Sequence, residues 1–151
     1  MSAKPEILPN SLYEQDYAAW ATETGRLIRE GRFAETDIEN VAEEIEAMAG
    51  RDRRELLNRM TVLIQHLLKW TSQPEKRSRS WQSTIVTQRI RIRRLLHQSP
   101  SLRAAVSGSL ADVYADAVVA ARAETGLPAD TFPARCPFSA AEILDLEFFP
   151  D

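Results

Sequence analysis

Residues 55–81 read ELLNRMTVLIQHLLKWTSQPEKRSRSW, and this stretch decides the fold. Its first half places apolar residues at three- and four-residue steps, the spacing of a helix with one apolar face. These residues are Leu56, Leu57, Met60, Leu63, Ile64, Leu67 and Leu68. So broad a face indicates burial against more than one neighbour. Pro74 ends this helix, because the residue before a proline avoids the α region. The stretch therefore predicts a central, buried helix that leads through a basic turn into another helix.

Apolar residues at helical spacing continue on both sides of this stretch. Predicted helices begin near Ser11, Thr36, Ser78 or Ser80, and Ser99, where a side chain can cap the first turn. A short last helix follows Ser139, and Gly126 ends the helix before it. No segment shows the alternation of apolar and polar residues that is typical of a strand.

The sequence thus predicts an all-α fold, a single-domain helical bundle of four to five long helices plus a short C-terminal helix. Phe148 and Phe149 near the C-terminus would be an apolar liability if exposed, so we expect a docked tail. Residues 1–10 contain two prolines and no periodicity, and they are predicted to form a loose N-terminal arm. The single helical domain is predicted to span residues 11–151.

Gly50 leaves one connection open. Asp52 followed by Glu55 offers a new N-cap, which favours a helix break and an antiparallel hairpin. A lone glycine costs a helix only about 1 kcal/mol, so a single kinked helix through Gly50 is the alternative.

Length and composition are those of a globular domain with a core of its own: 151 residues, 44% hydrophobic and 27% charged. No apolar run approaches the ~20 residues of a membrane span, and the N-terminus has no apolar signal region. Cys136 is the single cysteine and cannot form an internal disulfide. These features predict a cytoplasmic protein.

Charge is unevenly distributed along the chain. The net charge is −7 in residues 1–50, +9 in residues 51–97 and −5 in residues 98–151. Segments so opposed either face each other or attract an external anion.

Several strings occur in a characteristic order: LYEQDYAAW, REGRF, DIENVAEEIE, HLLKW with QPEKRSRSW, QR, SPSLR, ETGLP, TFP and CP. With these strings the chain resembles the bacterial family catalogued as domain of unknown function number 29, from about Leu12 to Pro150. The resemblance implies a bacterial, all-helical protein. It implies no assigned activity and no catalytic residues.

Polar residues intrude on two apolar helical faces: Glu44 on one, and Gln88 and Arg89 on another. Together with His66 and Arg77 they define a candidate polar cluster. A partly buried carboxylate requires a cation or a hydrogen-bond donor, and an arginine fork matches a carboxylate with two hydrogen bonds. We expect Glu44, or another acid of its helix, to pair with Arg89 or Arg77 in a structural contact that fixes helix register.

Residues with catalytic or metal-binding chemistry are few. Glu44, His66 and Asp37 could serve a metal or an acid–base site, but the Glu-x-x-His pair of metal-binding bundles is absent from the sequence. Cys136 follows Arg135, which favours a thiolate, yet no base is recognisable beside it in sequence. The sequence therefore predicts no catalytic, metal-binding or cofactor-binding residue, and an enzyme that uses Glu44 and His66 is the third-ranked hypothesis.

A basic segment offers a candidate anion-binding surface: Lys76, Arg77, Arg79, Arg91, Arg93 and Arg94. Such residues release counterions from a phosphate backbone. Trp81 lies in register with the apolar face, which disfavours base stacking, and the pI near 5.5 disfavours nucleic acid as a partner.

The first-ranked function is a non-enzymatic interaction or assembly module of the bacterial cytoplasm, with a protein partner or a homo-oligomer and no membrane association. The alternative is a weak anion or nucleic-acid binder that uses the basic surface of residues 76–94.

Overall fold

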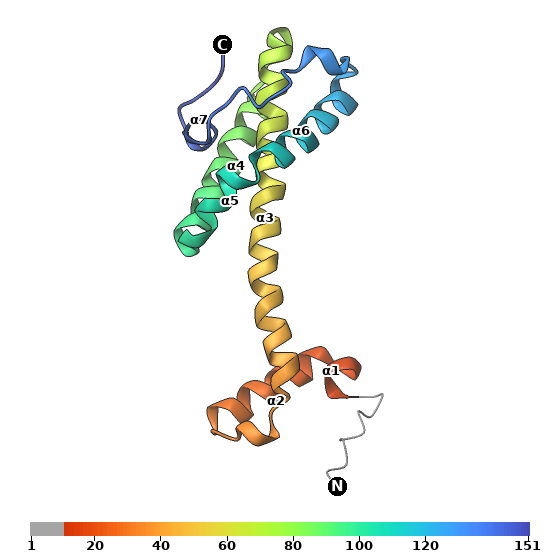
Figure 1. Ribbon diagram of the computed structural model, residues 1–151, viewed down its shortest axis with the longest axis vertical. Helices are drawn as coiled ribbons and strands as arrows, with labels where there is room; N and C mark the ends of the chain where they lie inside the picture. The colour runs from red at the N-terminus through yellow and green to blue at the C-terminus, as the bar shows by residue number, and fades with distance from the viewer. Residues whose placement is uncertain (1–10) are drawn as a thin grey trace. The chain divides into compact units, whose positions relative to one another are not determined.

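The computed structural model describes residues 11–151, and every regular element in that range is a helix (Figure 1). The prediction of an all-α fold is confirmed. The arm predicted for residues 1–10 lies outside the described residues. Packing divides the chain into two compact units, the first within residues 1–49 and the second spanning Gly50–Asp151. The single helical domain stays a prediction.

The first unit contains short helices and the beginning of a long one: α1 (Leu12–Gln15), α2 (Tyr17–Arg29), η1 (Phe33–Glu35) and the first turns of α3 (Ile38–Ser72). One helix was predicted from Ser11, but the chain breaks at Asp16, where the backbone is extended. The Asp16 carboxylate accepts a hydrogen bond from the Ala19 amide at 2.9 Å and caps α2. Gly31, with φ of 73°, follows the end of α2.

α3 is one continuous α-helix from Ile38 to Ser72, so the predicted hairpin at Gly50 is wrong. Gly50 does not adopt a positive φ, unlike Gly31 and Gly126. The helix penalty of about 1 kcal/mol for a lone glycine is outweighed by good helix formers on both sides. The helix ends two residues before Pro74, as predicted.

The second unit comprises the rest of α3 and all later elements: η2 (Pro74–Lys76), α4 (Arg79–Gln98), η3 (Pro100–Leu102), α5 (Arg103–Gly108), α6 (Leu110–Thr125), η4 (Ala129–Thr131) and α7 (Ala140–Leu144). Ser78 caps α4 by accepting from the Trp81 amide at 3.2 Å. Ser139 and Glu142 form a capping box at the start of α7, the short last helix that was predicted to follow Ser139. The helix predicted after Ser99 is divided into α5 and α6 at Ser109.

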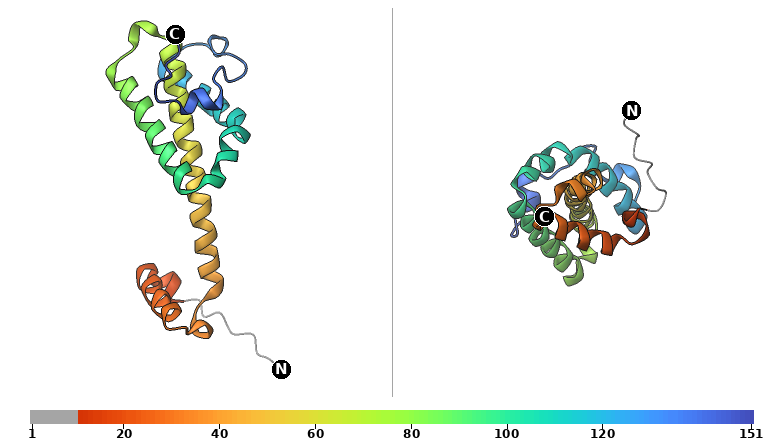
Figure 2. Two further views of the ribbon diagram at one scale, coloured as in Figure 1. Left: turned by 90° about the vertical axis from the view of Figure 1, so that its left-hand side faces the viewer. Right: turned by 90° about the horizontal axis from the view of Figure 1, so that it is seen from below.

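The core of the second unit lies around the C-terminal half of α3, with α4 and the α5–α6 segment packed against it (Figure 2). The fully buried side chains of α3 are those that the opening stretch predicted, Leu56, Met60, Leu63, Ile64 and Leu67. Ile85 and Ile92 of α4 and Ala117 of α6 complete the centre. Phe148 and Phe149 pack against this core, so the predicted docked tail is confirmed.

No single described helix is both long and apolar enough to cross a membrane. The bent pair of residues 100–108 and Leu110–Thr125, at 65° to each other, reaches the required length and apolarity only when its two helices are taken together.

Candidate interaction surface

The first unit exposes most of its large apolar side chains. Its buried residues in the described range are Trp20, Thr24 and Leu27. Its exposed large hydrophobic residues are Leu12, Tyr17, Ile28, Phe33, Ile38, Ile45 and Met48. Scattered exposed apolar residues are normal on any protein surface, but so many on so small a unit make it a candidate interaction surface.

Three of these residues form a row on α3, and we call Ile38, Ile45 and Met48 the open stripe. They are 54%, 62% and 58% exposed, respectively. Their spacing of seven and three residues puts them on one helical face. The sequence predicted them as the apolar face of a bundle helix, yet the described residues of the first unit leave them uncovered.

Glu44 marks one flank of the open stripe. Its carboxylate accepts hydrogen bonds from the phenols of Tyr13 at 2.5 Å and Tyr17 at 2.6 Å. The hydrogen bond to Glu44 raises the pKa of Tyr13 to about 12, because the carboxylate stabilises the protonated phenol. Adjacent helical residues are about 100° apart around the axis. These tyrosines therefore hold α1 and α2 beside Ile45 rather than over it.

Both flanks of the open stripe are acidic. Between residues 33 and 49 the sequence contains no Lys or Arg, and its carboxylates are Glu35, Asp37, Glu39, Glu43, Glu44 and Glu46. At 3.6 residues per turn, Asp37 and Glu44 fall on one side of the stripe, and Glu39 and Glu46 on the other. The complement of this surface is an apolar stripe with basic borders.

The predicted polar cluster does not form around Arg89. Arg89 is 0% exposed, and its guanidinium donates to three carbonyl oxygens of the C-terminal segment. The acceptors are Ile143 at 2.8 Å, Phe148 at 2.6 Å and Glu142 at 3.1 Å. Burial lowers the pKa of Arg89. Its role is to hold the tail on α4, where the sequence predicted an ion pair with an acid.

The other members of that cluster also have separate partners. The Nδ1 of His66 lies 2.8 Å from the Val62 carbonyl oxygen, and burial lowers the pKa of this imidazole. Arg77 donates to the Trp70 carbonyl at 2.8 Å and lies 5.0 Å from the centre of that ring. Gln88 accepts from Arg59 at 3.2 Å, whereas Glu44 belongs to the first unit. Within the second unit, the structure therefore gives His66, Arg77, Gln88 and Arg89 separate partners and does not bring them into one site.

The six residues of the predicted anion-binding surface are also divided. Lys76 and Arg79 are exposed around the start of α4, and Arg77 is held by Trp70. Arg93 donates to the Leu144 carbonyl at 3.1 Å. Arg91 and Arg94 line a hollow with residues of α3. Sequence reasoning missed the arginines of α3 at this hollow and beside it, although their steps of three and five residues (Arg51, Arg54, Arg59) were visible.

Lys69 was also missed. Its side chain is buried within the second unit, where it forms an ion pair with Glu124 of α6. Its Nζ lies 4.5 Å from the centre of the Trp81 ring, a cation–π distance. The hydrogen bond from Lys69 lowers the pKa of Glu124. Lys69 thus joins α3, α4 and α6 through a buried charge that the apolar pattern does not reveal.

The remaining chemical candidates do not assemble into a reactive group. Burial raises the pKa of the Cys136 thiol, which lies 3.4 Å from the Phe138 carbonyl oxygen, so the environment disfavours a thiolate. Within residues 11–151 no three His, Cys, Asp or Glu side chains are placed to hold a metal ion.

Comparison with known proteins supports the family resemblance. The chain matches the family model described as "Domain of unknown function DUF29" over residues 12–149. No curated protein and no solved structure matches it. Because the match covers nearly the whole chain, this protein belongs to the DUF29 family.

Proposed function

We propose that this protein is a non-enzymatic interaction module whose first unit binds a basic, amphipathic helix of a partner protein. The observation that carries the proposal is the exposure of Ile38, Ile45 and Met48 on one helical face. An apolar row at this spacing can pack against the apolar face of another helix.

The small core of the first unit supports a partner. Trp20 and Leu27 are its buried apolar residues in the described range. A unit of fewer than about 60 residues buries a smaller fraction of the surface that its unfolded chain exposes than a larger domain does, so its stability on its own is marginal. Burial of the open stripe by a partner would supply apolar contacts that the described residues of this unit lack.

Charge selects the kind of partner. A second copy of this chain, paired through the same stripe, would place carboxylates such as Glu39 and Glu46 against carboxylates. Like charges across an interface are unfavourable, whereas opposite charges accelerate association and select the partner. A helix with an apolar stripe bordered by Lys and Arg fits better than a second copy.

The proposed setting is the bacterial cytoplasm. The family resemblance supports a bacterial source, and a half-buried single cysteine is compatible with a reducing compartment. The alternative role of the 76–94 surface as an anion binder has less support, since Arg77 and Arg93 are engaged by backbone carbonyls. An enzyme built on Glu44 and His66 also lacks support, because the tyrosines engage Glu44 and the Val62 carbonyl engages His66.

The test uses two synthetic helical peptides with the same leucine stripe, one bordered by Lys and Arg and the other by Glu. We expect the basic peptide to bind the full chain and the acidic peptide not to bind, as measured by fluorescence anisotropy. The variant Ile45→Ser/Met48→Ser should lose binding. Val119→Ser, which changes an exposed apolar residue of the second unit, should retain it.

Sedimentation of the same variants decides between partner and self-association. A dimer of the wild-type chain that is lost in Ile45→Ser/Met48→Ser would show a second copy on the stripe and would overturn the proposed partner chemistry. Equal binding of both peptides, or of neither, would also contradict the proposal.

A further inference from the structure

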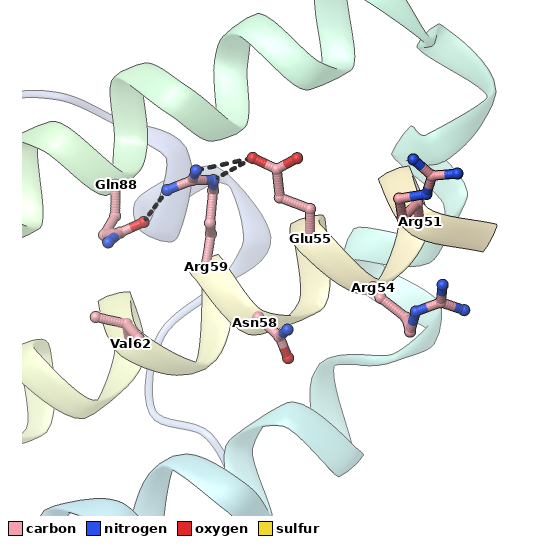
Figure 3. Close-up of a pocket in the computed structure, with 7 residues that line it drawn as sticks. All are labelled: Arg51, Arg54, Glu55, Asn58, Arg59, Val62 and Gln88. Carbon is pink, nitrogen blue, oxygen red and sulfur yellow. Dashed lines mark hydrogen bonds and ion pairs between the residues drawn. The ribbon is translucent and has the colours of Figure 1, made fainter. Parts of the chain in front are cut away.

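A groove along α3 and α4 of the second unit presents arginines to solvent, and we propose that it binds an anion carrying several phosphate groups (Figure 3). This site is separate from the open stripe and does not depend on the proposed function. The groove has a volume of 470 Å³, and its lining residues are Arg51, Arg54, Glu55, Asn58, Arg59, Val62 and Gln88.

The helical repeat gathers the lining residues. Arg51, Arg54 and Asn58 are three to four residues apart on α3, so they share a face. The buried residues Leu56 and Met60 lie on another face of the same helix. Gln88 reaches the groove from α4 (Figure 3). The core thus fixes the backbone that carries the arginines, and with it the separation of their Cα atoms.

The arginines of the groove differ in their partners. Arg59 is held in place by an ion pair with Glu55 at 2.8 Å and by its hydrogen bond to Gln88 (Figure 3). Arg51 and Arg54 have no carboxylate within ion-pair distance among residues 11–151. The guanidinium groups of Arg51 and Arg54 are therefore available to an external anion. They lie beside Arg59, whose guanidinium is already oriented by Glu55 and Gln88.

Gly50 contributes to the position of Arg54. A Cβ atom at Gly50 would lie 3.3 Å from the Nη1 of Arg54, closer than ordinary van der Waals contact. Because Gly50 has no side chain, the guanidinium of Arg54 can lie against the backbone of Gly50, one helical turn toward the N-terminus. Arg54 is thereby placed near Arg51 at the same end of the groove (Figure 3).

A second hollow extends the basic surface across α4. It has a volume of 220 Å³, it shares Glu55 and Arg59 with the groove, and it adds Asp52, Arg91, Arg94, Leu95 and Gln98. Together the two hollows are lined by five arginines and two carboxylates, a net charge of +3. This local charge is opposite in sign to the net charge of the chain, −3.

The chemistry of the lining selects phosphate. The planar arginine fork matches phosphate oxygens with two hydrogen bonds, and Asn58 and Gln88 add amide groups. No aromatic side chain lines either hollow, so neither offers a stacking surface for a base. Arginines spread along two helices favour several linked phosphates over a single one. Recognition would be independent of base identity and weakened by salt.

The experiment is a calorimetric titration of the full chain with inorganic tripolyphosphate, and separately with a single-stranded oligothymidylate, at low salt. The test variant is Arg51→Gln/Arg54→Gln. The control is Lys76→Gln/Arg79→Gln, which removes the same charge from exposed residues around the start of α4. We expect the test variant to weaken binding by about tenfold or more, because two charge-assisted contacts are lost, and the control to weaken it by less than about threefold.

Each outcome decides a point. Tripolyphosphate binding that is sensitive to Arg51 and Arg54 supports a free oligophosphate as the ligand. Binding of the oligonucleotide alone, with the same sensitivity, supports a nucleic-acid backbone. If neither probe binds, or if both variants weaken binding equally, the groove is not a phosphate site. Circular dichroism of both variants verifies that their helices remain folded.

Discussion

At the scale of single residues, Arg89 shows how a buried cation is stabilised without a carboxylate. It lies within the apolar face of α4, where burial of an unpaired charge is costly. The carbonyls that it meets include those of Glu142 and Ile143 near the end of α7, where the last C=O groups lack helical partners. One side chain therefore satisfies the end of a helix and anchors the tail that follows it.

Replacement of Arg89 by methionine should destabilise the protein strongly. Methionine fills part of the volume but leaves the carbonyls of Glu142, Ile143 and Phe148 without their donor. Each buried acceptor that loses its partner costs about 1–3 kcal/mol, so we expect a loss of about 3 kcal/mol or more in the free energy of unfolding. Urea denaturation measures it, with exposed Arg91→Met as the control expected within about 0.5 kcal/mol of wild type. Equal midpoints for the two variants would show that the tail contacts contribute nothing.

The sequence indicated that Gln88 and Arg89 were unusual, because both interrupt an apolar face. It did not identify their partners. A carbonyl oxygen is present at every residue, so an arginine that binds backbone leaves no complementary residue type to search for. The ion pair predicted with Glu44 followed from side-chain chemistry alone. Such matching does not consider backbone carbonyls as hydrogen-bond acceptors.

At the scale of elements, α3 shows the limit of local signals. Asp52 and Gly50 together resemble a helix end and a new cap, yet the helix continues through both. Capping is worth about 1 kcal/mol, similar to the penalty for one glycine, so these two signals do not decide between a break and a continuation. The good helix formers on both sides of Gly50 favour the continuation. By contrast, the cap at Ser139 was predicted, and Ser78 is one of the two caps predicted for α4, because prolines or polar turns there already prevent a continuous helix.

Gly50→Ala tests the continuity of α3. If residue 50 is helical in solution, alanine should raise the free energy of unfolding by about 0.5–1 kcal/mol, because it has the higher helix propensity. The contact of its Cβ with Arg54 involves the end of a flexible side chain, which can move. Gly126→Ala is the contrasting control: its φ of 71° strains alanine, so this variant should be less stable than wild type. A loss of stability in both, by thermal denaturation, would indicate a break at Gly50.

At the scale of the whole molecule, most of the second unit could be predicted from the sequence. Periodicity identified the buried face of α3 and the apolar faces of α4 and α6, and the apolar character of Phe148 and Phe149 indicated the docked tail. Periodicity cannot show whether an apolar face is covered, so the exposure of Ile38, Ile45 and Met48 was not foreseen. The arginine groove was missed for a related reason: its residues come from α3 and α4, and their proximity depends on which helices pack together.

The charge distribution along the sequence allowed many ion pairs between basic and acidic segments, but the described residues form few of them. Within the second unit, Lys69–Glu124 is the ion pair that joins distant residues among those described. Most arginines of the 51–97 segment instead bind carbonyls, pair within one helix turn or face solvent, and Arg53 donates to the Ser109 hydroxyl at 3.3 Å. A basic segment that is not neutralised internally is available to an external anion, which is why the groove carries a binding proposal.

The last prediction concerns the stability of the two units. The first buries Trp20, Thr24 and Leu27, whereas the second contains at least nine fully buried large apolar side chains. An isolated 13-residue helix such as α2 is marginal in water, so its protection depends on those few contacts. We expect amide hydrogens of residues 21–29 to exchange at least about a hundredfold faster than those of residues 60–68 in the full chain, as measured by hydrogen exchange with mass spectrometry.

Removal of residues 1–49 should leave the slow exchange of residues 60–68 unchanged, because their buried contacts lie within the second unit. Equal protection of the two segments would mean that the first unit is stabilised as strongly as the second. The small core of the first unit would then no longer support the proposal that a partner covers its exposed apolar stripe.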